Sequence, residues 1–115
     1  MPLRFCRPLE YFRTIIMKKF YCRIYEQGSD RLLAVSDSSI IGKTFEDGEL
    51  RIDVSDFYRG EECSESEAIR LVKSAIIVNA VGKGIVALML KEKIITKDGI
   101  LEIKGVPHAQ VVAIK

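Results

Sequence analysis

The stretch SESEAIRLVKSAIIVNAVGKGIVALML, residues 64–90, decides the fold of this chain of 115 residues. It begins with Ser64 and Glu67, whose spacing is that of a capping box at the start of a helix. Apolar residues then recur at helical spacing, and charged or small polar residues fall on the opposite side. We therefore predict one continuous amphipathic helix from about Ser64 to Val81, with Gly82 as its C-terminal cap.

The glycines of this stretch permit a second interpretation. Gly82, Gly84 and Ala87 match G-x-G-x-x-A, the phosphate-cradling turn of dinucleotide-binding proteins, which requires a strand directly before the first glycine. The β-branched residues before Gly82, and Glu102 near the usual position of a ribose-binding acid, favour this interpretation. The predicted helix before Gly82, and the shortness of the helix expected over residues 85–93, oppose it. We expect a joint between two helices and no bound cofactor.

Outside this stretch the chain predicts short strands. Between the second and third of them, Ser36 or Asp37 is expected to cap one helical turn that ends at Gly42. The length of the chain suits a single small domain with one core. We predict an α+β two-layer sandwich, in which a small mixed or antiparallel sheet of about five strands packs against one long and one short helix. The expected strands lie within residues 18–25, 31–36, 50–54, 99–105 and 109–115.

The first sixteen residues differ from the rest of the chain. We interpret residues 1–16 as an N-terminal tail or a misassigned start, and the single α+β domain as residues 17–115. Leu9, Phe12 and Ile16 form a helical stripe that is too short to indicate a membrane-surface helix. No apolar run reaches the roughly 20 residues that cross a bilayer, so we expect a cytoplasmic protein without membrane contact.

Charge and cysteine content limit the classes of partner. The net charge of +2 arises within residues 1–16, and residues 17–115 carry equal numbers of acidic and basic side chains. A neutral body argues against strong binding to nucleic-acid backbone. The three cysteines, Cys6, Cys22 and Cys63, are widely spaced and lack the pairs typical of zinc sites, so we expect reduced thiols and no metal.

His108 is the single histidine and the first candidate site residue. Gly105 and Pro107 precede it, and we expect a rigid loop that displays the imidazole beside Gln110, suited to proton transfer or to a polar ligand. The alternative is that His108 caps a strand or bonds a carbonyl group. Asn79 interrupts the predicted apolar helix face, and it either ties the helix end to a loop or lines a pocket with His108. Because the sequence reveals no catalytic partner, we lean against an enzyme.

Three further candidates lie between residues 43 and 59. Tyr58 is suited to stacking on a base and Arg59 to contacting a phosphate, as in single-strand binders. Lys43 belongs to a set of basic residues that would form one face if the helix and the strand edges align. The set is Lys43, Arg51, Arg59, Arg70, Lys73 and Lys83.

Three ordered motifs connect the chain to a known family. They are SDSSIIGKTFEDGELRIDVSDFYRG (36–60), SAIIVNAVG (74–82) and IKGVPHAQVV (103–112). With their GKTF, FYRG, NAVG and GVPHAQ elements, the chain from residue 17 onward resembles an archaeal family of small uncharacterised proteins. The resemblance implies an archaeal cytoplasmic protein with a two-layer α+β fold. It brings no established activity and therefore no catalytic residues.

Three hypotheses for function follow. The first is a non-enzymatic binding module for RNA or the translation machinery, with an affinity that falls as salt rises. The second is an enzyme or small-ligand protein centred on His108, Gln110 and Asn79, which requires a concave pocket lined by both His108 and Asn79. The third is an adaptor or subunit that binds another protein through a sheet edge or an apolar patch.

Overall fold

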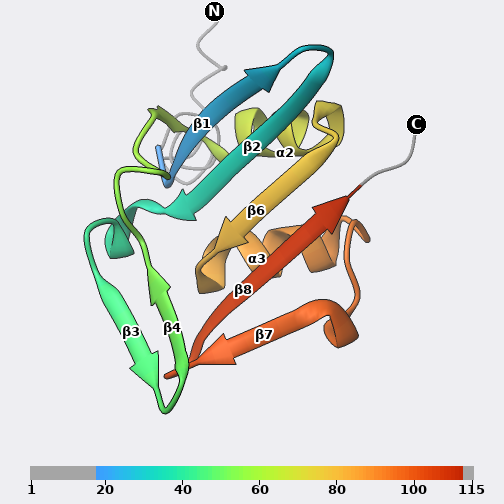
Figure 1. The fold of residues 1–115 in the computed structure, drawn as a ribbon. Coiled ribbons are helices and arrows are strands. Elements are labelled where there is room, and N and C mark those ends of the chain that lie inside the picture. The colour runs from blue at the N-terminus through green and yellow to red at the C-terminus, as the bar shows by residue number, and fades with distance from the viewer. Residues whose placement is uncertain (1–17, 113–115) are drawn as a thin grey trace, which may run out of the picture.

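A computed structural model describes residues 18–112, so the predicted tail at residues 1–16 lies outside the described residues. The described chain forms an α+β fold around a mixed sheet, as expected (Figure 1). The sheet has six strands in place of about five, and a separate two-stranded ribbon accompanies it. The sheet strands are β1 (Phe20–Gln27), β2 (Asp30–Asp37), β5 (Glu61–Cys63), β6 (Ile77–Val81), β7 (Ile100–Ile103) and β8 (Val106–Val112).

The strand order across the sheet is β5-β1-β2-β6-β8-β7. Only the central pair β2–β6 is parallel, and every other neighbouring pair within the described sheet is antiparallel. Strands far apart in the chain thus meet at the centre, where β6 lies between β2 and β8. Residues on these three strands share the middle of each sheet face.

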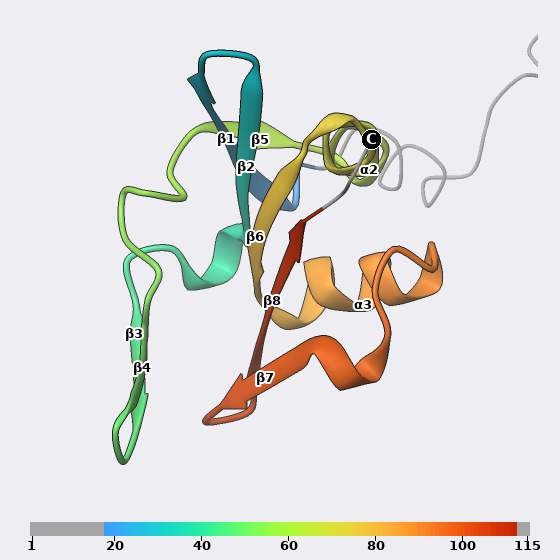
Figure 2. The same cartoon turned by 45° about the vertical axis from the view of Figure 1, so that its right-hand side comes forward.

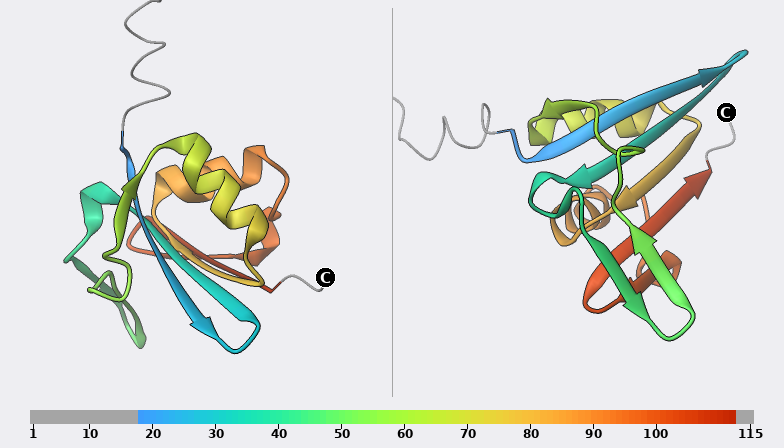
Figure 3. Two further views of the ribbon diagram at one scale, coloured as in Figure 1. Left: turned by 90° about the horizontal axis from the view of Figure 1, so that it is seen from above. Right: turned by 60° about the vertical axis from the view of Figure 1, so that its left-hand side comes forward.

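The molecule has three layers where we predicted two. Two helices, α2 (Glu65–Ser74) and α3 (Lys83–Lys91), cover one face of the sheet. The ribbon of β3 (Thr44–Asp47) and β4 (Leu50–Asp53) lies on the other side (Figure 2). A view from above shows both helices on the same side of the strands (Figure 3). The sequence missed β3 because its four residues hold one apolar side chain, too few for an alternating pattern.

The predicted helix from Ser64 to Val81 is wrong in its second half. The capping box is present, because Ser64 Oγ accepts from the Glu67 amide and the Ser64 amide donates to Glu67 Oε1. The helix ends at Ser74, and Ala75 is already extended. Ile76 then donates its amide to the carbonyl of Arg31, which leads the chain into β6 beside β2.

The side chains of residues 76–81 explain this change. Ile76, Ile77 and Val78 are β-branched, and such residues lose rotamer freedom in a helix and pack well on a pleated sheet. Val78 and Ala80 join the core beneath the helices, while Val81 joins the core beneath the ribbon. Asn79 faces the ribbon side by the same alternation. It therefore interrupts no apolar face.

The two cores differ in size. The helix side holds the larger cluster, to which strands and both helices contribute. The ribbon side holds a smaller one around Ala34, Val54, Tyr58 and Ile103. Because the ribbon covers only part of the sheet, the remaining part of this face stays accessible.

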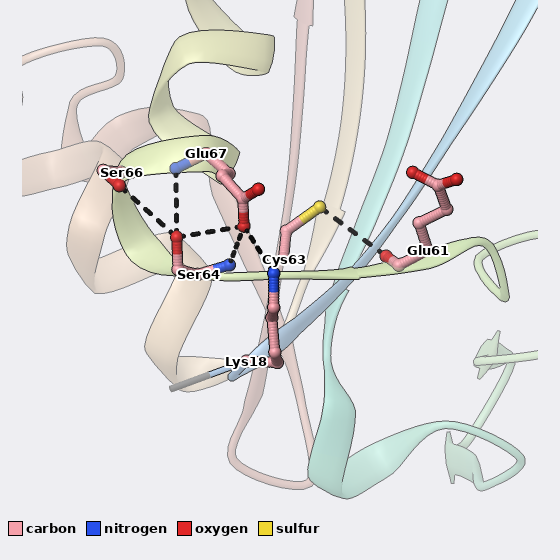
Figure 4. Close-up of polar contacts among 6 residues, drawn as sticks. All are labelled: Lys18, Glu61, Cys63, Ser64, Ser66 and Glu67. Carbon is pink, nitrogen blue, oxygen red and sulfur yellow. Dashed lines mark hydrogen bonds and ion pairs between the residues drawn. The ribbon is translucent and has the colours of Figure 1, made fainter. Parts of the chain in front are cut away.

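The start of β1 is tied to the first turn of α2. Lys18 Nζ lies 3.1 Å from Glu67 Oε1, and Lys19 Nζ lies 3.1 Å from Glu65 Oε2. Figure 4 shows how Glu67 also meets Ser64. The Ser64 amide, together with Lys18, lowers the pKa of Glu67 to about 2. This carboxylate therefore stays ionised across the neutral and mildly acidic range.

Candidate functional site

The glycine motif does follow a strand. Strand β6 ends at Val81, Gly82 takes a φ of 123°, and α3 begins at Lys83. The objection drawn from the sequence, that a helix precedes Gly82, is therefore wrong. The local order of strand, glycine and helix is the one that a dinucleotide fingerprint requires.

The phosphate position of this motif is nevertheless filled by Asp37, at the end of β2. The amide of Gly84 donates to Asp37 Oδ2 at 2.7 Å, and that of Ile85 donates to Oδ1 at 2.8 Å. A side chain at residue 82 would meet the Asp37 carboxyl carbon at 2.5 Å, so glycine is needed for this approach. Asp37 was expected to cap the turn that follows it, but its side chain makes no such cap bond. It caps α3 instead.

The surrounding topology also departs from a dinucleotide fold. That motif joins two parallel strands through its helix. Here the strand that follows α3 is β7, which lies at the sheet edge and is separated from β6 by β8, a strand antiparallel to both. Glu102 lies on the edge strand β7, with β8 between it and β6. The glycine motif therefore works as an internal joint.

A cleft opens on the opposite face of the sheet. It lies between the ribbon and strands β6, β8 and β7, and its volume is about 620 Å³. Its floor is made by Asn79, His108 and Gln110 together with Leu101 and Ile103. Its wall comes from β4 and the loop after it, and consists of Glu49, Leu50, Arg51, Ile52, Asp53, Ser55, Phe57 and Tyr58.

The sheet register brings the polar floor residues together. Asn79 lies directly opposite Gln110, and His108 lies opposite Val81, one diagonal step from Asn79. His108 Nε2 is 2.8 Å from Asn79 Oδ1. With the carboxamide oxygen as acceptor, Nε2 carries the proton and Nδ1 remains an acceptor. The predicted loop at His108 is wrong, since the residue lies within β8, and of the two alternatives for Asn79 the geometry corresponds to the one in which it lines a pocket with His108.

Burial sets the charge of the imidazole. Desolvation lowers the pKa of His108 below its ordinary value of 6.5. Its hydrogen-bond partner is a neutral carboxamide, which does not favour the imidazolium as a carboxylate would. At neutral pH the floor of the cleft is therefore uncharged.

This shift makes stability depend on pH. The unfolded chain binds a proton at the imidazole at higher pH than the folded chain does, so acid favours unfolding. We expect the free energy of unfolding to fall as the pH drops through 6.5 toward the lower pKa of the folded state. Urea titrations between about pH 7.5 and pH 5.5 measure it, with His108→Gln as the control. Equal pH dependence in the two proteins would contradict the assignment.

The wall of the cleft carries more negative than positive charge. Arg51 Nη1 lies 2.6 Å from Glu46 Oε2, and Arg51 also bonds Asp53 at 3.2 Å. The hydrogen bond from Arg51, with a second from Thr44, lowers the pKa of Asp53. Glu49 adds a further negative charge. Among the described residues that line the cleft, the one cation is Arg51, and it is already paired.

Phe57, and not Tyr58, is the aromatic residue of this loop that is exposed. Tyr58 is only 6% exposed, its pKa is raised by burial, and it supports the cleft from within the core. Phe57 is exposed, and its ring stacks on Tyr25 with centroids 4.9 Å apart. The guanidinium of Arg23 lies 5.0 Å from the centroid of the Tyr25 ring.

The remaining candidates lie away from the floor. Arg59 pairs with Asp56 at 3.0 Å and lies over the ring of Tyr21. Lys43 lines a separate hollow of about 340 Å³ beside the ribbon. The helix and the strand edges do not align these basic residues into one face, because Arg70 lies on α2 and Lys43 precedes β3 on the other side of the sheet.

Residues 18–112 contain no group of three or more His, Cys, Asp or Glu side chains placed to hold a metal ion. Within the same part of the chain, none of the helices has the length and apolar character needed to span a bilayer.

Comparisons with known proteins identify a family and a similar fold. The family model described as "Protein of unknown function (DUF424)" matches residues 25–114. No curated protein matches the chain. A solved structure described as an uncharacterized conserved protein from Methanopyrus kandleri is similar, with a TM-score of 0.68 and 22% identity over 80% of this chain and 89% of that one. At this identity the likeness shows the fold alone. The resemblance to an archaeal family of small uncharacterised proteins is confirmed.

Proposed function

We propose that this chain, which belongs to the DUF424 family of proteins of unknown function, is a cytoplasmic binding protein that holds a small uncharged ligand in the cleft. The observation that carries the proposal is the hydrogen-bonded pair of Asn79 and His108 on the floor of a concave site. A volume of about 620 Å³ lies within the range of small-molecule sites.

The floor presents polar groups that remain available to a ligand. Among the described residues nothing bonds Asn79 Nδ2, His108 Nδ1 or the side-chain amide of Gln110. Asn79 Nδ2 offers a hydrogen-bond donor, His108 Nδ1 offers an acceptor, and the amide of Gln110 offers both. A ligand with neighbouring acceptor and donor atoms, such as an amide or a nitrogen heterocycle, complements this floor.

The rim supplies apolar contact. Leu50, Phe57 and Leu101 are among the exposed large hydrophobic residues, and all three line the cleft. Burying such side chains against a ligand contributes roughly 25 cal/mol per Å² of apolar surface. A few polar groups that fix orientation inside a largely apolar wall are typical of ligand sites.

The same geometry favours binding over catalysis. When a histidine acts as a general base, an acidic partner usually orients the imidazole and stabilises its protonated form. His108 is oriented by a carboxamide instead. Two acidic side chains of the ribbon, Glu46 and Asp53, are both bonded to Arg51 and not to the imidazole. We therefore interpret His108 as a ligand contact and not as a proton-transfer group.

We expect His108→Ala to weaken ligand binding about tenfold or more, since losing one partner of a buried hydrogen bond costs roughly 1–3 kcal/mol. The measurement is an NMR titration with a library of uncharged amides and heterocycles, followed at the side-chain amides of Asn79 and Gln110. Thr96→Ala is the matched control, because Thr96 is exposed and lies in the segment between α3 and β7. A library ligand that binds both variants equally, or no binding at the cleft at all, would defeat the proposal.

The second candidate is single-stranded RNA or a ribosomal partner. The observation that favours it is the stack of Arg23, Tyr25 and Phe57, which continues from the cleft wall. The charge of this surface argues against RNA, because Arg59 is already paired with Asp56 and Arg51 with two acids. RNA binding predicts an affinity that falls with salt, and Arg23→Ala should reduce the slope by about one. Co-purification with and without nuclease distinguishes the two kinds of partner. A partner that nuclease releases is held through RNA, whereas one that remains bound is a protein, as expected for an adaptor.

A further inference from the structure

Two thiols, that of Cys22 on β1 and that of Cys63 on β5, are neighbours on adjacent strands. In the register of this pair, Cys63 is opposite Phe20 and Cys22 is opposite Glu61, so the two cysteines are diagonal neighbours. Both belong to the core beneath the helices, and each thiol contributes to the pKa shift of the other. The Cys63 thiol also contacts the carbonyl oxygen of Glu61 at 3.6 Å (Figure 4).

A surface hollow reaches this pair. Its volume is about 430 Å³, and both cysteines line it together with Gly60, Glu67 and Arg70. Each cysteine is nonetheless about 5–6% exposed, which leaves room for a small reagent and not for another protein. Diagonal neighbours on adjacent strands are within reach of a disulfide after a small shift. Strand β5 has three residues and lies at the sheet edge, so such a shift disturbs few hydrogen bonds.

We propose that Cys22 and Cys63 form a site of reversible oxidation, at which hydrogen peroxide converts the two thiols into a cross-strand disulfide. In the first step the Cys63 thiolate attacks one peroxide oxygen, the O–O bond breaks, and the leaving oxygen departs as water after taking up a proton. In the second step the Cys22 sulfur attacks the sulfenic acid sulfur, the S–O bond breaks, and water leaves with the Cys22 proton. The two thiols lose two electrons in total, and hydrogen peroxide is reduced to two waters.

The environment of the pair assigns the order of these steps. Burial raises the pKa of both thiols. For Cys63, the hydrogen bond from Cys22 and the charge of Lys18 oppose this rise, while Cys22 has no such opposing contribution. Cys63 therefore supplies the first thiolate. Since the thiolate fraction is small, the reaction is slow at neutral pH and accelerates with rising pH.

The bond would act on the candidate site through β5. This strand joins the loop that carries Phe57 and Tyr58 to the start of α2. At the end of that loop, a side chain on Gly60 would lie 2.1 Å from the Cys22 carbonyl oxygen, so the two segments are already in close contact. A disulfide would fix β5 to β1 and restrain the wall of the cleft.

The test uses the full chain with Cys6→Ser, which leaves Cys22 and Cys63 as its only thiols. After hydrogen peroxide treatment we expect a mass loss of about 2 Da, loss of both titratable thiols, and one non-reduced peptide pair that contains Cys22 and Cys63. Dithiothreitol should reverse all three. The melting temperature of the oxidised protein should rise by roughly 10 °C, because the bond closes a long loop of the unfolded chain.

Two single variants, Cys22→Ser and Cys63→Ser, serve as controls and should show no mass loss of this kind. Three outcomes would overturn the proposal: both thiols survive treatment that oxidises free cysteine, both gain oxygen without joining, or the bond forms between chains. Because the readout is mass and not ligand binding, failure here leaves the cleft untouched.

Discussion

Gly82→Ala should destabilise the fold by about 4 kcal/mol, a large fraction of the 5–15 kcal/mol that hold a typical domain together. The φ of 123° at Gly82 is a conformation that alanine rarely adopts. The new methyl group would also lie 2.5 Å from the carboxyl carbon of Asp37. The backbone must therefore rotate, and Asp37 must withdraw from the start of α3. Urea unfolding measures the loss.

Gly99→Ala is the matched control for this experiment. Gly99 has an ordinary φ, and a side chain there meets nothing within 4 Å. We expect its free energy of unfolding to change by less than about 0.5 kcal/mol. If Gly82→Ala costs no more than Gly99→Ala, the close approach of Asp37 to the glycine joint is wrong.

Asp37→Ala should cost about 3 kcal/mol, since it removes two charge-assisted hydrogen bonds at a helix N-terminus. The amide of Ile85, partly buried, loses its acceptor, and the positive end of the helix dipole loses its counter-charge. Asp37→Asn should recover part of the loss, because its carboxamide oxygen still accepts from one amide. Thermal unfolding and hydrogen exchange at the Ile85 amide provide the readouts.

The Asp37→Ala variant carries a second, independent expectation. An emptied helix N-terminus with free amides favours anions. Added sulfate or phosphate should therefore stabilise Asp37→Ala more than the wild-type protein, by mass action on the folded state. Equal stabilisation of the two proteins would mean that Asp37 does not fill this position.

The parts of the fold that local chemistry dictates were predictable. The capping box of Ser64 and Glu67 lies three residues apart and needs no distant partner. Alternation along residues 18–25 predicted β1, the apolar run at 31–36 after a turn predicted β2, and the apolar run at 85–93 predicted α3 within two residues. Each of these patterns is complete within one turn or one strand.

The end of the first helix was not predictable from periodicity. A continuous apolar run suits a helix face and a buried strand equally well. The deciding partner is β2, which lies more than forty residues earlier and accepts β6 along its free edge. β-branched residues at Ile76, Ile77 and Val78 were the local sign of this pairing.

The candidate site likewise combines residues that the sequence could identify with contacts that it could not. His108 and Asn79 were identifiable as the lone histidine and as a polar residue among apolar ones. Their contact depends on a register between strands 29 residues apart. The role of Asp37 depends on residues 47 and 48 positions away, and the cleft wall depends on a ribbon whose first strand has little pattern. No local signal specifies these contacts.

Asp37 closes the glycine joint, and we propose that ligands enter the opposite face. The most direct measurement is the shift of backbone amide resonances when a nucleotide cofactor, such as NAD, is titrated into the protein. We expect the resonances of the Gly84 and Ile85 amides to stay unchanged up to millimolar cofactor. A saturable shift of these two amides would show that the joint binds phosphate and that Asp37 does not close it.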